Sequence, residues 1–266
     1  MSELTRRLLF GVPAALFFLW LVWRGGVSFG ILTGVLALFT MLEMVRLFKK
    51  YKYSAFTVIS IIIAIYIWSV GLLPVSWVVG IGAGIALLTL YSLFSRNRSF
   101  GNRWLASLIC GTYAPLGFYL FYRIRELEPE SAGLWLTLAV VIMVWCNDIL
   151  AYAGGRMFGK RPMAPTISPN KTWEGFWSGF AGAAIGFILV WLSADSFPLP
   201  LPASLPLIVI IGFFGPLGDL LESRLKRLAD MKDSSSLLPG HGGLFDRFDA
   251  FILAVPVVFL YLNWVL

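Results

Sequence analysis

The chain has 266 residues, of which 59% are hydrophobic and only 13% are charged, and its mean hydropathy is +0.83. A soluble domain carries about twice that share of charged residues, so the composition excludes an ordinary soluble protein and predicts an all-α, polytopic integral membrane protein. The net charge of +7 does not indicate nucleic-acid binding, because the basic residues lie in short segments between apolar runs.

Apolar runs of about 20 residues, the length of a helix that crosses a bilayer, recur along the whole chain. They predict a helical bundle of about nine transmembrane helices, in which the break between the third and fourth depends on Gly71 and Pro74. We divide the chain into N-terminal transmembrane helices, about four spans in residues 1–104, and a C-terminal catalytic transmembrane region, about five spans in residues 105–266. The predicted spans are residues 8–23, 27–47, 54–73, 75–94, 104–122, 134–153, 176–192, 205–221 and 248–266.

The basic residues predict the orientation of these spans. With nine spans, 18 of the 21 Lys and Arg residues lie on the side of the N-terminus, and only Arg24, Arg123 and Arg125 lie on the other. The positive-inside rule therefore predicts a cytoplasmic N-terminus and a C-terminus outside. The loops richest in polar residues, 154–173 and 223–247, are then both cytoplasmic. We expect an active site that faces the cytoplasm, in a bacterial inner (cytoplasmic) membrane.

The first polar stretch covers residues 148–175. Asp148 and Tyr152 are four residues apart and share a helix face, glycines and basic residues follow, and the sequence SPNKTWEG closes the stretch. Hydroxyls and cations of this kind can grip a triphosphate, and Trp173 can stack on a base, although no Walker loop occurs. Positive-inside charge alone also accounts for the lysines and arginines, so both interpretations stay open.

The second polar stretch is the end of the eighth span. Glycines and Pro216 permit a kink and a close approach of backbones just before Asp219 and Glu222, which share a helix face at a spacing of three. A solvated helix end is the plainer interpretation of Asp219, and Glu222 can simply pair with Lys226. Carboxylates beside a dense charge cluster at a membrane nevertheless predict a functional site.

The third polar stretch, residues 240–249, contains the only histidine, His241. Glycines surround it, and their bare amides can approach a phosphate. Asp246 and Asp249 follow at the start of the ninth span, and Asp246 facing Asp219 would form a carboxylate site for a hard cation such as Mg²⁺. Capping of the helix by aspartates is the alternative, and it is stronger for Asp249 than for Asp246. The residues alone therefore predict Asp219 and Asp246 as a carboxylate pair for the cation.

Three residues elsewhere receive structural interpretations. Glu43 is expected to pair with Arg46 near a helix end. Cys110 and Cys146 lie inside apolar runs, so we expect them in the core rather than in a disulfide or a metal site.

The stretch from Ser223 to Asp249 resembles the signature of the phosphatidate cytidylyltransferase (CDP-diacylglycerol synthase) family. The stretches DILAYAGGRMFGK and SPNKTWEG upstream are also similar to that family, whereas the N-terminal helices resemble it only in hydropathy. The signature positions that match are Ser223, Lys226, Arg227, Lys232, Asp233, Pro239, His241, Gly242, Gly243, Asp246, Arg247 and Asp249.

The resemblance implies a nucleotidyltransferase that converts CTP and phosphatidate to CDP-diacylglycerol and diphosphate in phospholipid biosynthesis, with Mg²⁺. The metal ligands that it implies are Asp219 and Asp246, with Asp249 as a third candidate. It adds a monovalent cation such as K⁺, on which the residues themselves are silent, and homodimers are common in such families. The expected partners are CTP, phosphatidate and the lipid bilayer, and no nucleic acid. The catalytic residues that it implies are Asp219, Lys226, Arg227, Lys232, His241, Asp246 and Arg247. The residues expected to shape the nucleotide site are Asp148, Tyr152, Ser168, Lys171, Thr172, Glu174 and Ser223.

Two other functions compete with this interpretation. A CTP-dependent lipid kinase, for example one acting on a polyprenol, would transfer the γ-phosphoryl group to a hydroxyl, with His241 or an aspartate as base. A transporter is the alternative from another class, because intramembrane carboxylates and broken helices occur there too. The match to the whole signature argues against the kinase, and the lack of an evident internal repeat argues against the transporter.

Overall fold

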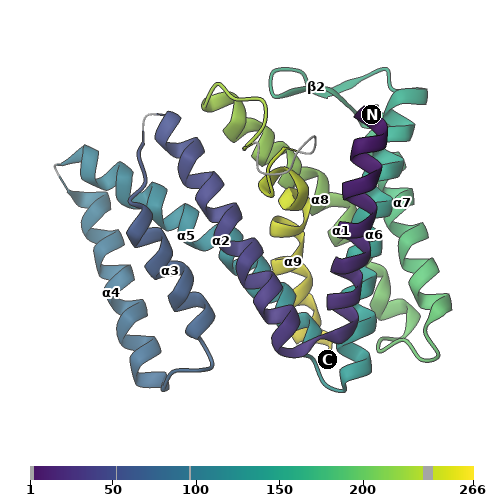
Figure 1. The fold of residues 1–266 in the computed structure, drawn as a ribbon, viewed down its shortest axis with the longest axis horizontal. Coiled ribbons are helices and arrows are strands. Elements are labelled where there is room, and N and C mark those ends of the chain that lie inside the picture. The colour runs from purple at the N-terminus through teal and green to yellow at the C-terminus, as the bar shows by residue number, and fades with distance from the viewer. Residues whose placement is uncertain (1–2, 52, 96, 236–241) are drawn as a thin grey trace.

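A computed structural model describes residues 3–51, 53–95, 97–235 and 242–266, with residues 3–10 described by their backbone alone. These residues form nine α-helices and one two-stranded antiparallel hairpin (Figure 1). The helices are α1 Glu3–Arg24, α2 Gly26–Lys50, α3 Thr57–Ser69, α4 Val75–Phe94, α5 Arg98–Arg125, α6 Glu130–Phe158, α7 Trp173–Ser193, α8 Leu201–Leu228 and α9 Phe245–Val265. The strands, β1 Pro162–Ala164 and β2 Ser168–Thr172, lie in a segment for which the sequence predicts only a loop.

Seven of these helices, α2 and α4 to α9, are long and apolar enough to cross a membrane. Helices dominate because hydrocarbon offers no partner for backbone N–H and C=O groups. The all-α, polytopic membrane fold is therefore confirmed, with nine helices among the described residues. The helix α3 is shorter than predicted, because the chain leaves it at Val70 and turns through Gly71, whose φ is +96°, before Pro74 precedes α4.

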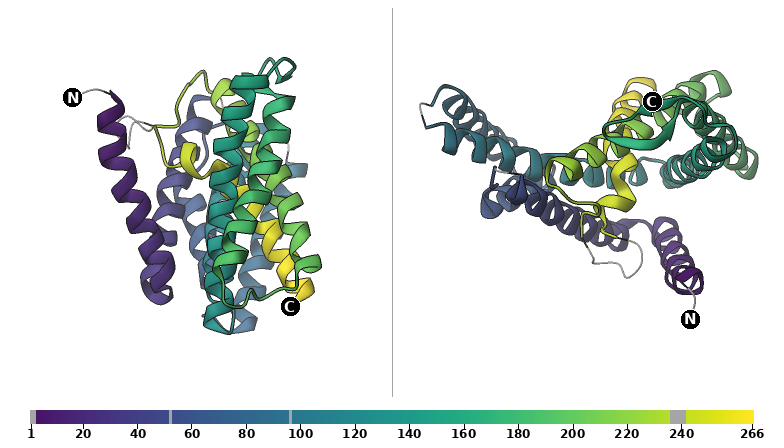
Figure 2. Two further views of the ribbon diagram at one scale, coloured as in Figure 1. Left: turned by 90° about the vertical axis from the view of Figure 1, so that its right-hand side faces the viewer. Right: turned by 90° about the horizontal axis from the view of Figure 1, so that it is seen from above.

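The helices run up and down, so α1 begins at the end of the bundle where α6 and α8 finish, and α9 finishes at the other end (Figures 1 and 2). The pair α6 and α7 packs along its whole length. A side chain at Gly182 or Gly186 of α7 would collide with the backbone of Cys146 or Met143 in α6. Glycines at these positions let the two backbones approach, which is how helices associate in a membrane.

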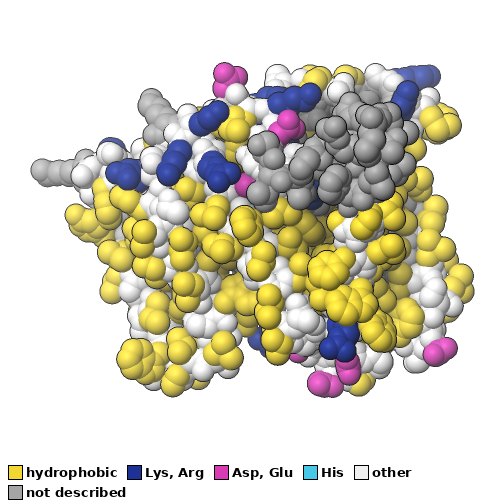
Figure 3. Space-filling view, viewed as in Figure 1, with side chains coloured by type: hydrophobic (Ala, Val, Ile, Leu, Met, Phe, Trp, Pro, Cys, Tyr) yellow, Lys and Arg dark blue, Asp and Glu magenta, His cyan; other side chains and the backbone are white. Residues whose placement is uncertain are grey.

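The surface of the bundle divides by polarity. Figure 3 shows Lys and Arg side chains along the end where α6 and α8 finish, and a broad hydrophobic band below them. Acidic side chains also lie at this end, and the residues that carry the predicted chemistry are found here. Cys110 is buried and Cys146 is half-buried, and both are free thiols, as predicted.

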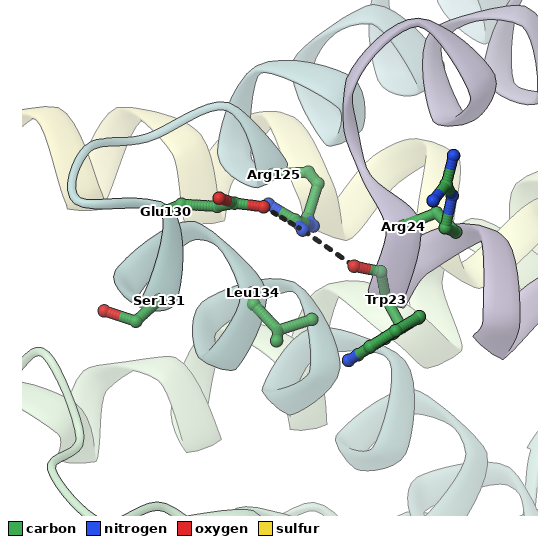
Figure 4. Close-up of a pocket in the computed structure, with 6 residues that line it drawn as sticks. All are labelled: Trp23, Arg24, Arg125, Glu130, Ser131 and Leu134. Carbon is green, nitrogen blue, oxygen red and sulfur yellow. Dashed lines mark hydrogen bonds and ion pairs between the residues drawn. The ribbon is translucent and has the colours of Figure 1, made fainter.

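The opposite end of the bundle is closed by Arg125, at the end of α5. Its buried guanidinium donates to the carbonyls of Val22 (2.7 Å) and Trp23 (3.0 Å), the last turn of α1, and lies 3.5 Å from Glu130 (Figure 4). Gly25, with φ +62°, makes the turn into α2, and a Cβ there would lie 2.6 Å from the guanidinium. The side chains of Trp23, Arg24, Arg125 and Glu130 border a cavity of about 440 Å³ at the end of the molecule away from the predicted site (Figure 4).

Replacing Arg125 by methionine is expected to destabilise the fold by about 1.5–3 kcal/mol, because two carbonyls at the end of α1 lose a charged donor. The melting temperature in detergent measures this loss. The exposed Arg123, which donates to the hydroxyl of Tyr119 in its own helix, provides the matched control as Arg123→Met. An unchanged melting temperature in Arg125→Met would contradict the role of Arg125 in joining α1 to α5.

Candidate active site

Three carboxylates gather where α8 ends and α9 begins. One oxygen each of Asp219, Glu222 and Asp249 lies within 4.8 Å of the others, and we call these residues the acidic cluster. Glu222 and Asp249 are buried, whereas Asp219 is 41% exposed and opens the cluster to the surface. The close packing of α8 on α9 depends on Gly218, where a Cβ would collide with the carbonyl of Asp249. The predicted shared face of Asp219 and Glu222 is thus present in the structure.

Two lysines border the acidic cluster. Lys171, at the end of β2, lies 2.5 Å from Asp219, and Lys226 lies 2.8 Å from Glu222, which is the pairing predicted at a spacing of four. Lys226 also lies 2.7 Å from Asp246, so it joins that aspartate to the cluster. Contact of either lysine with a phosphate remains a prediction, because both lysines form ion pairs with carboxylates in this structure.

Asp246 makes a set of contacts that differs from the predicted pairing with Asp219. Besides Lys226, it accepts hydrogen bonds from the backbone N–H of Ser234 (3.0 Å), the Ser234 hydroxyl (2.8 Å) and the N–H of Gly243 (2.7 Å). At Gly242, whose φ is +77°, a Cβ would lie 2.8 Å from the carboxylate. Gly242 and Gly243 therefore lie directly against Asp246, and the N–H of Gly243 donates to this carboxylate. A direct bond from Asp246 to a metal remains a prediction.

The first polar stretch, residues 148–175, lies beside the acidic cluster and contributes Lys171 to the site. Thr172 caps α7, because its hydroxyl accepts from the N–H of Gly175 (3.2 Å). Glu174 accepts hydrogen bonds from the N–H groups of Lys160 (3.1 Å) and Arg161 (3.2 Å), so it fixes the start of the hairpin. Of these two predicted nucleotide residues, Thr172 is thus occupied at the start of α7, and Glu174 holds the start of the hairpin, which carries Lys171 to Asp219.

Other predicted residues surround this centre. Asp148, near the end of α6, is exposed and interacts electrostatically with Asp219, Lys171 and Arg247. Ser223 donates to Asp219 (3.3 Å). Tyr152 is exposed and accepts a hydrogen bond from Arg156 (3.2 Å), and Ser168 begins β2. Arg227 donates to the carbonyl of Ile167 (3.4 Å), whereas Lys232 and Arg247 are exposed. The predicted His241 lies outside the described residues.

Sequence reasoning missed the part played by two acidic residues. The sequence predicts Glu222 as a simple partner of Lys226, although its spacing from Asp219 already places these two carboxylates on one face of the helix. The interpretation of Glu43 as a partner of Arg46 is wrong: Glu43 is buried and accepts hydrogen bonds from the segment that precedes α9. A carboxylate inside an apolar span is functional by default, and that signal was available for Glu43.

The acidic cluster has the chemistry of a divalent-cation site. Hard oxygen donors are the ligands that Mg²⁺ prefers, and Oε1 of Glu222 is buried with no hydrogen-bond partner among the described residues. Around the cluster, the described residues provide five carboxylates and three cations, a formal charge of −2. They are Asp148, Asp219, Glu222, Asp246 and Asp249, with Lys171, Lys226 and Arg247. One divalent cation would balance this charge.

Comparison with known proteins agrees with this site. Residues 5–265 match the sequence model of the cytidylyltransferase family. The chain is 34% identical to the phosphatidate cytidylyltransferase of Bacillus subtilis over 98% of each chain. It is 35% identical to the protein of the same name from Staphylococcus haemolyticus, over 95% of this chain and 96% of that relative. The chain belongs to the cytidylyltransferase family, as the signature from Ser223 to Asp249 predicts.

Proposed function

We propose that the chain is a phosphatidate cytidylyltransferase, which converts CTP and phosphatidate to CDP-diacylglycerol and diphosphate. The observation that carries the proposal is the assembly of Asp219, Glu222 and Asp249 at the basic end of a membrane bundle, within the family signature. Carboxylates that suit a divalent cation, with cations beside them, match a reaction between two polyanions. The names of the relatives from Bacillus and Staphylococcus support the same reaction.

The chemistry requires positioning and charge neutralisation more than proton transfer. An oxygen of the phosphatidate phosphate forms a bond to the α-phosphorus of CTP, and the bond from that phosphorus to the oxygen between the α- and β-phosphates breaks, so that this oxygen leaves as a terminal oxygen of diphosphate. The attacking oxygen is already anionic, so no strong general base is needed. Magnesium held by Asp219, Glu222 and Asp249, with Asp246 nearby, would supply neutralisation of phosphate charge. Arg227, Lys232 and Arg247 bind the phosphates of the two substrates.

We further propose that the site faces the cytoplasm of a bacterial inner membrane. The basic end of the bundle in Figure 3 is also the end at which α1 begins, and an excess of Lys and Arg marks the cytoplasmic side. CTP then arrives from water, while the acyl chains of phosphatidate stay beside the hydrophobic band. The phosphate of the lipid reaches the acidic cluster at the level of the headgroups.

The test uses purified protein in detergent with phosphatidate, magnesium and CTP labelled at either the α- or the γ-phosphate. Label from α-labelled CTP in a chloroform-soluble product, with none from γ-labelled CTP and none in excess EDTA, is the expected result. Label in lipid from γ-labelled CTP would instead identify a lipid kinase. No labelled lipid from folded protein in either arm would contradict both enzymes and leave transport to be tested.

A further inference from the structure

Glu43 is a buried carboxylate in α2, 2% exposed, far in sequence from the signature. Its Oε1 accepts from the Ser235 hydroxyl (2.6 Å) and the N–H of Leu244 (3.1 Å). Its Oε2 accepts from the Ser234 hydroxyl (3.0 Å) and the N–H of Phe245 (2.8 Å). Each oxygen therefore lies against one hydroxyl and one backbone amide, and the Ser234 hydroxyl shares its single proton between Glu43 and Asp246.

These contacts make Glu43 the cap of a helix to which it does not belong. The first N–H groups of any helix lack partners within it, and a side chain at the start of the helix normally accepts from them. In α9 that position is Leu244, which has no such side chain. The carboxylate of Glu43 fulfils this role from α2, which lies beside the start of α9, and its negative charge suits the N-terminus of a helix (Figure 1).

The same carboxylate leaves no room for a side chain at Gly243, two residues before α9. A Cβ at Gly243 would collide with the Ser234 hydroxyl and would lie 2.5 Å from Oε2 of Glu43. The absence of a side chain at Gly243 thus lets the segment lie directly on the carboxylate. This second glycine of the HGG motif fits Glu43, in the way that Gly242 fits Asp246.

A continuous set of contacts leads from Glu43 to the acidic cluster. The hydroxyl of Ser234 lies within hydrogen-bond distance of both Glu43 (3.0 Å) and Asp246 (2.8 Å). Asp246 pairs with Lys226 (2.7 Å), and Lys226 pairs with Glu222 (2.8 Å). Glu43 is therefore joined by these contacts to the first turn of α9, and both Asp246 and Asp249 lie near the start of that helix.

We propose that Glu43 is a positioning residue for the transfer reaction, contributed by α2 to a site built from α6 to α9. This inference rests on the proposed cytidylyl transfer. In the proposed reaction, Glu43 contacts no reacting atom. It holds the start of α9 in the register at which Asp249 meets Asp219 and Glu222, and at which Asp246 meets Lys226.

Glutamine is the discriminating substitution at this position. It keeps the shape of the side chain, but one oxygen becomes an NH₂ group, which cannot accept a hydrogen bond from the N–H of Leu244 or of Phe245. One backbone N–H then stays buried without a partner, whichever way the amide turns. Glu43→Asp keeps both acceptors on a shorter stem, so it should retain more function than Glu43→Gln. Glu128→Gln makes the same chemical change on the exposed loop at the other end of the bundle and is the matched control.

The experiment has a structural and a catalytic readout on the full-length protein in detergent. Hydrogen–deuterium exchange, without metal or substrate, measures the amides of residues 244 and 245. In Glu43→Gln these amides should exchange about tenfold faster, as expected for one lost hydrogen bond, while peptides from α6 and α7 stay unchanged. The kcat for label transfer from α-labelled CTP should fall about 10–100-fold, the usual effect of a lost supporting contact. Glu128→Gln should match the wild type in both assays.

Other outcomes are equally decisive. Faster exchange at residues 244 and 245 with an unchanged kcat would overturn the proposal, because Glu43 would then only anchor the chain. Wild-type values in both readouts would overturn it as well. If Glu43→Gln fails to fold, Ser235→Ala removes one donor and should produce the same pattern to a smaller degree; no effect there would count against the proposal. A wild type that makes no labelled lipid would refute the proposed function, while the exchange arm still tests the contact.

Discussion

Replacement of Asp249 by asparagine is expected to lower the rate of cytidylyl transfer by about 10²-fold or more, with the fold retained. The loss follows from the removal of one charged ligand from the acidic cluster, because metal neutralisation of phosphate charge contributes several kcal/mol to such reactions. Asparagine can keep the hydrogen bond that Asp249 accepts from the N–H of Ala250 (2.7 Å). The substitution therefore changes charge more than shape.

Metal removal gives the same variant a second readout. In the wild type, Mg²⁺ at ten times its dissociation constant should stabilise the protein by about 1.4 kcal/mol and raise the melting temperature, and EDTA should reverse the rise. Asp249→Asn should lose this response. Without metal, it should melt no lower than the wild type, because Asp249 faces the like charges of Asp219 and Asp148. Relief of that repulsion favours the folded state.

The matched control is Asp195→Asn, an identical change at an exposed position between α7 and α8. It should leave both the transfer rate and the magnesium response as in the wild type. Wild-type transfer and a normal magnesium response in Asp249→Asn would contradict the assignment of this residue as a metal ligand. That outcome would leave the cytidylyl transfer itself standing.

The helical framework could be predicted from the sequence because the bilayer imposes it. Apolar runs near 20 residues and the breaks between them follow from local composition, and the turn at Gly71 and Pro74 depends on backbone properties of those two residues alone. The strand pair at 162–172 could not be predicted in this way. It depends on Glu174, which lies in the first turn of α7 and accepts from two N–H groups of the preceding segment.

The site was predictable where its residues are close in sequence. Asp219, Glu222 and Lys226 share one face of α8 by helix periodicity, and the structure keeps them together. The family resemblance, and not helix periodicity, places Asp249 among the predicted metal ligands with Asp219, because the approach of α9 depends on the absence of a side chain at Gly218. The contact of Glu43 with the segment before α9 joins residues about 200 positions apart, and no local pattern reports it.

Replacement of Lys226 by methionine is expected to destabilise the protein by about 3–5 kcal/mol, the usual effect of removing one partner from a buried ion pair. Lys226 is 14% exposed and neutralises two carboxylates, Glu222 at 2% exposure and Asp246 at 7%. The melting temperature in detergent with EDTA measures the loss. Lys232→Met, at an exposed position, should change stability by no more than about 0.5 kcal/mol.

A second substitution shows which carboxylate depends on Lys226. Asp246 retains three donors from Ser234 and Gly243 after the lysine is gone, whereas Oε1 of Glu222 has no partner among the described residues. Glu222→Gln should therefore restore much of the stability lost in Lys226→Met, and Asp246→Asn should restore less, because the contacts of Oδ2 with Ser234 and Gly243 already stabilise the charge of Asp246. The reverse order would show that Lys226 mainly stabilises Asp246, and so belongs with the contacts of Ser234 and Gly243 rather than with the acidic cluster.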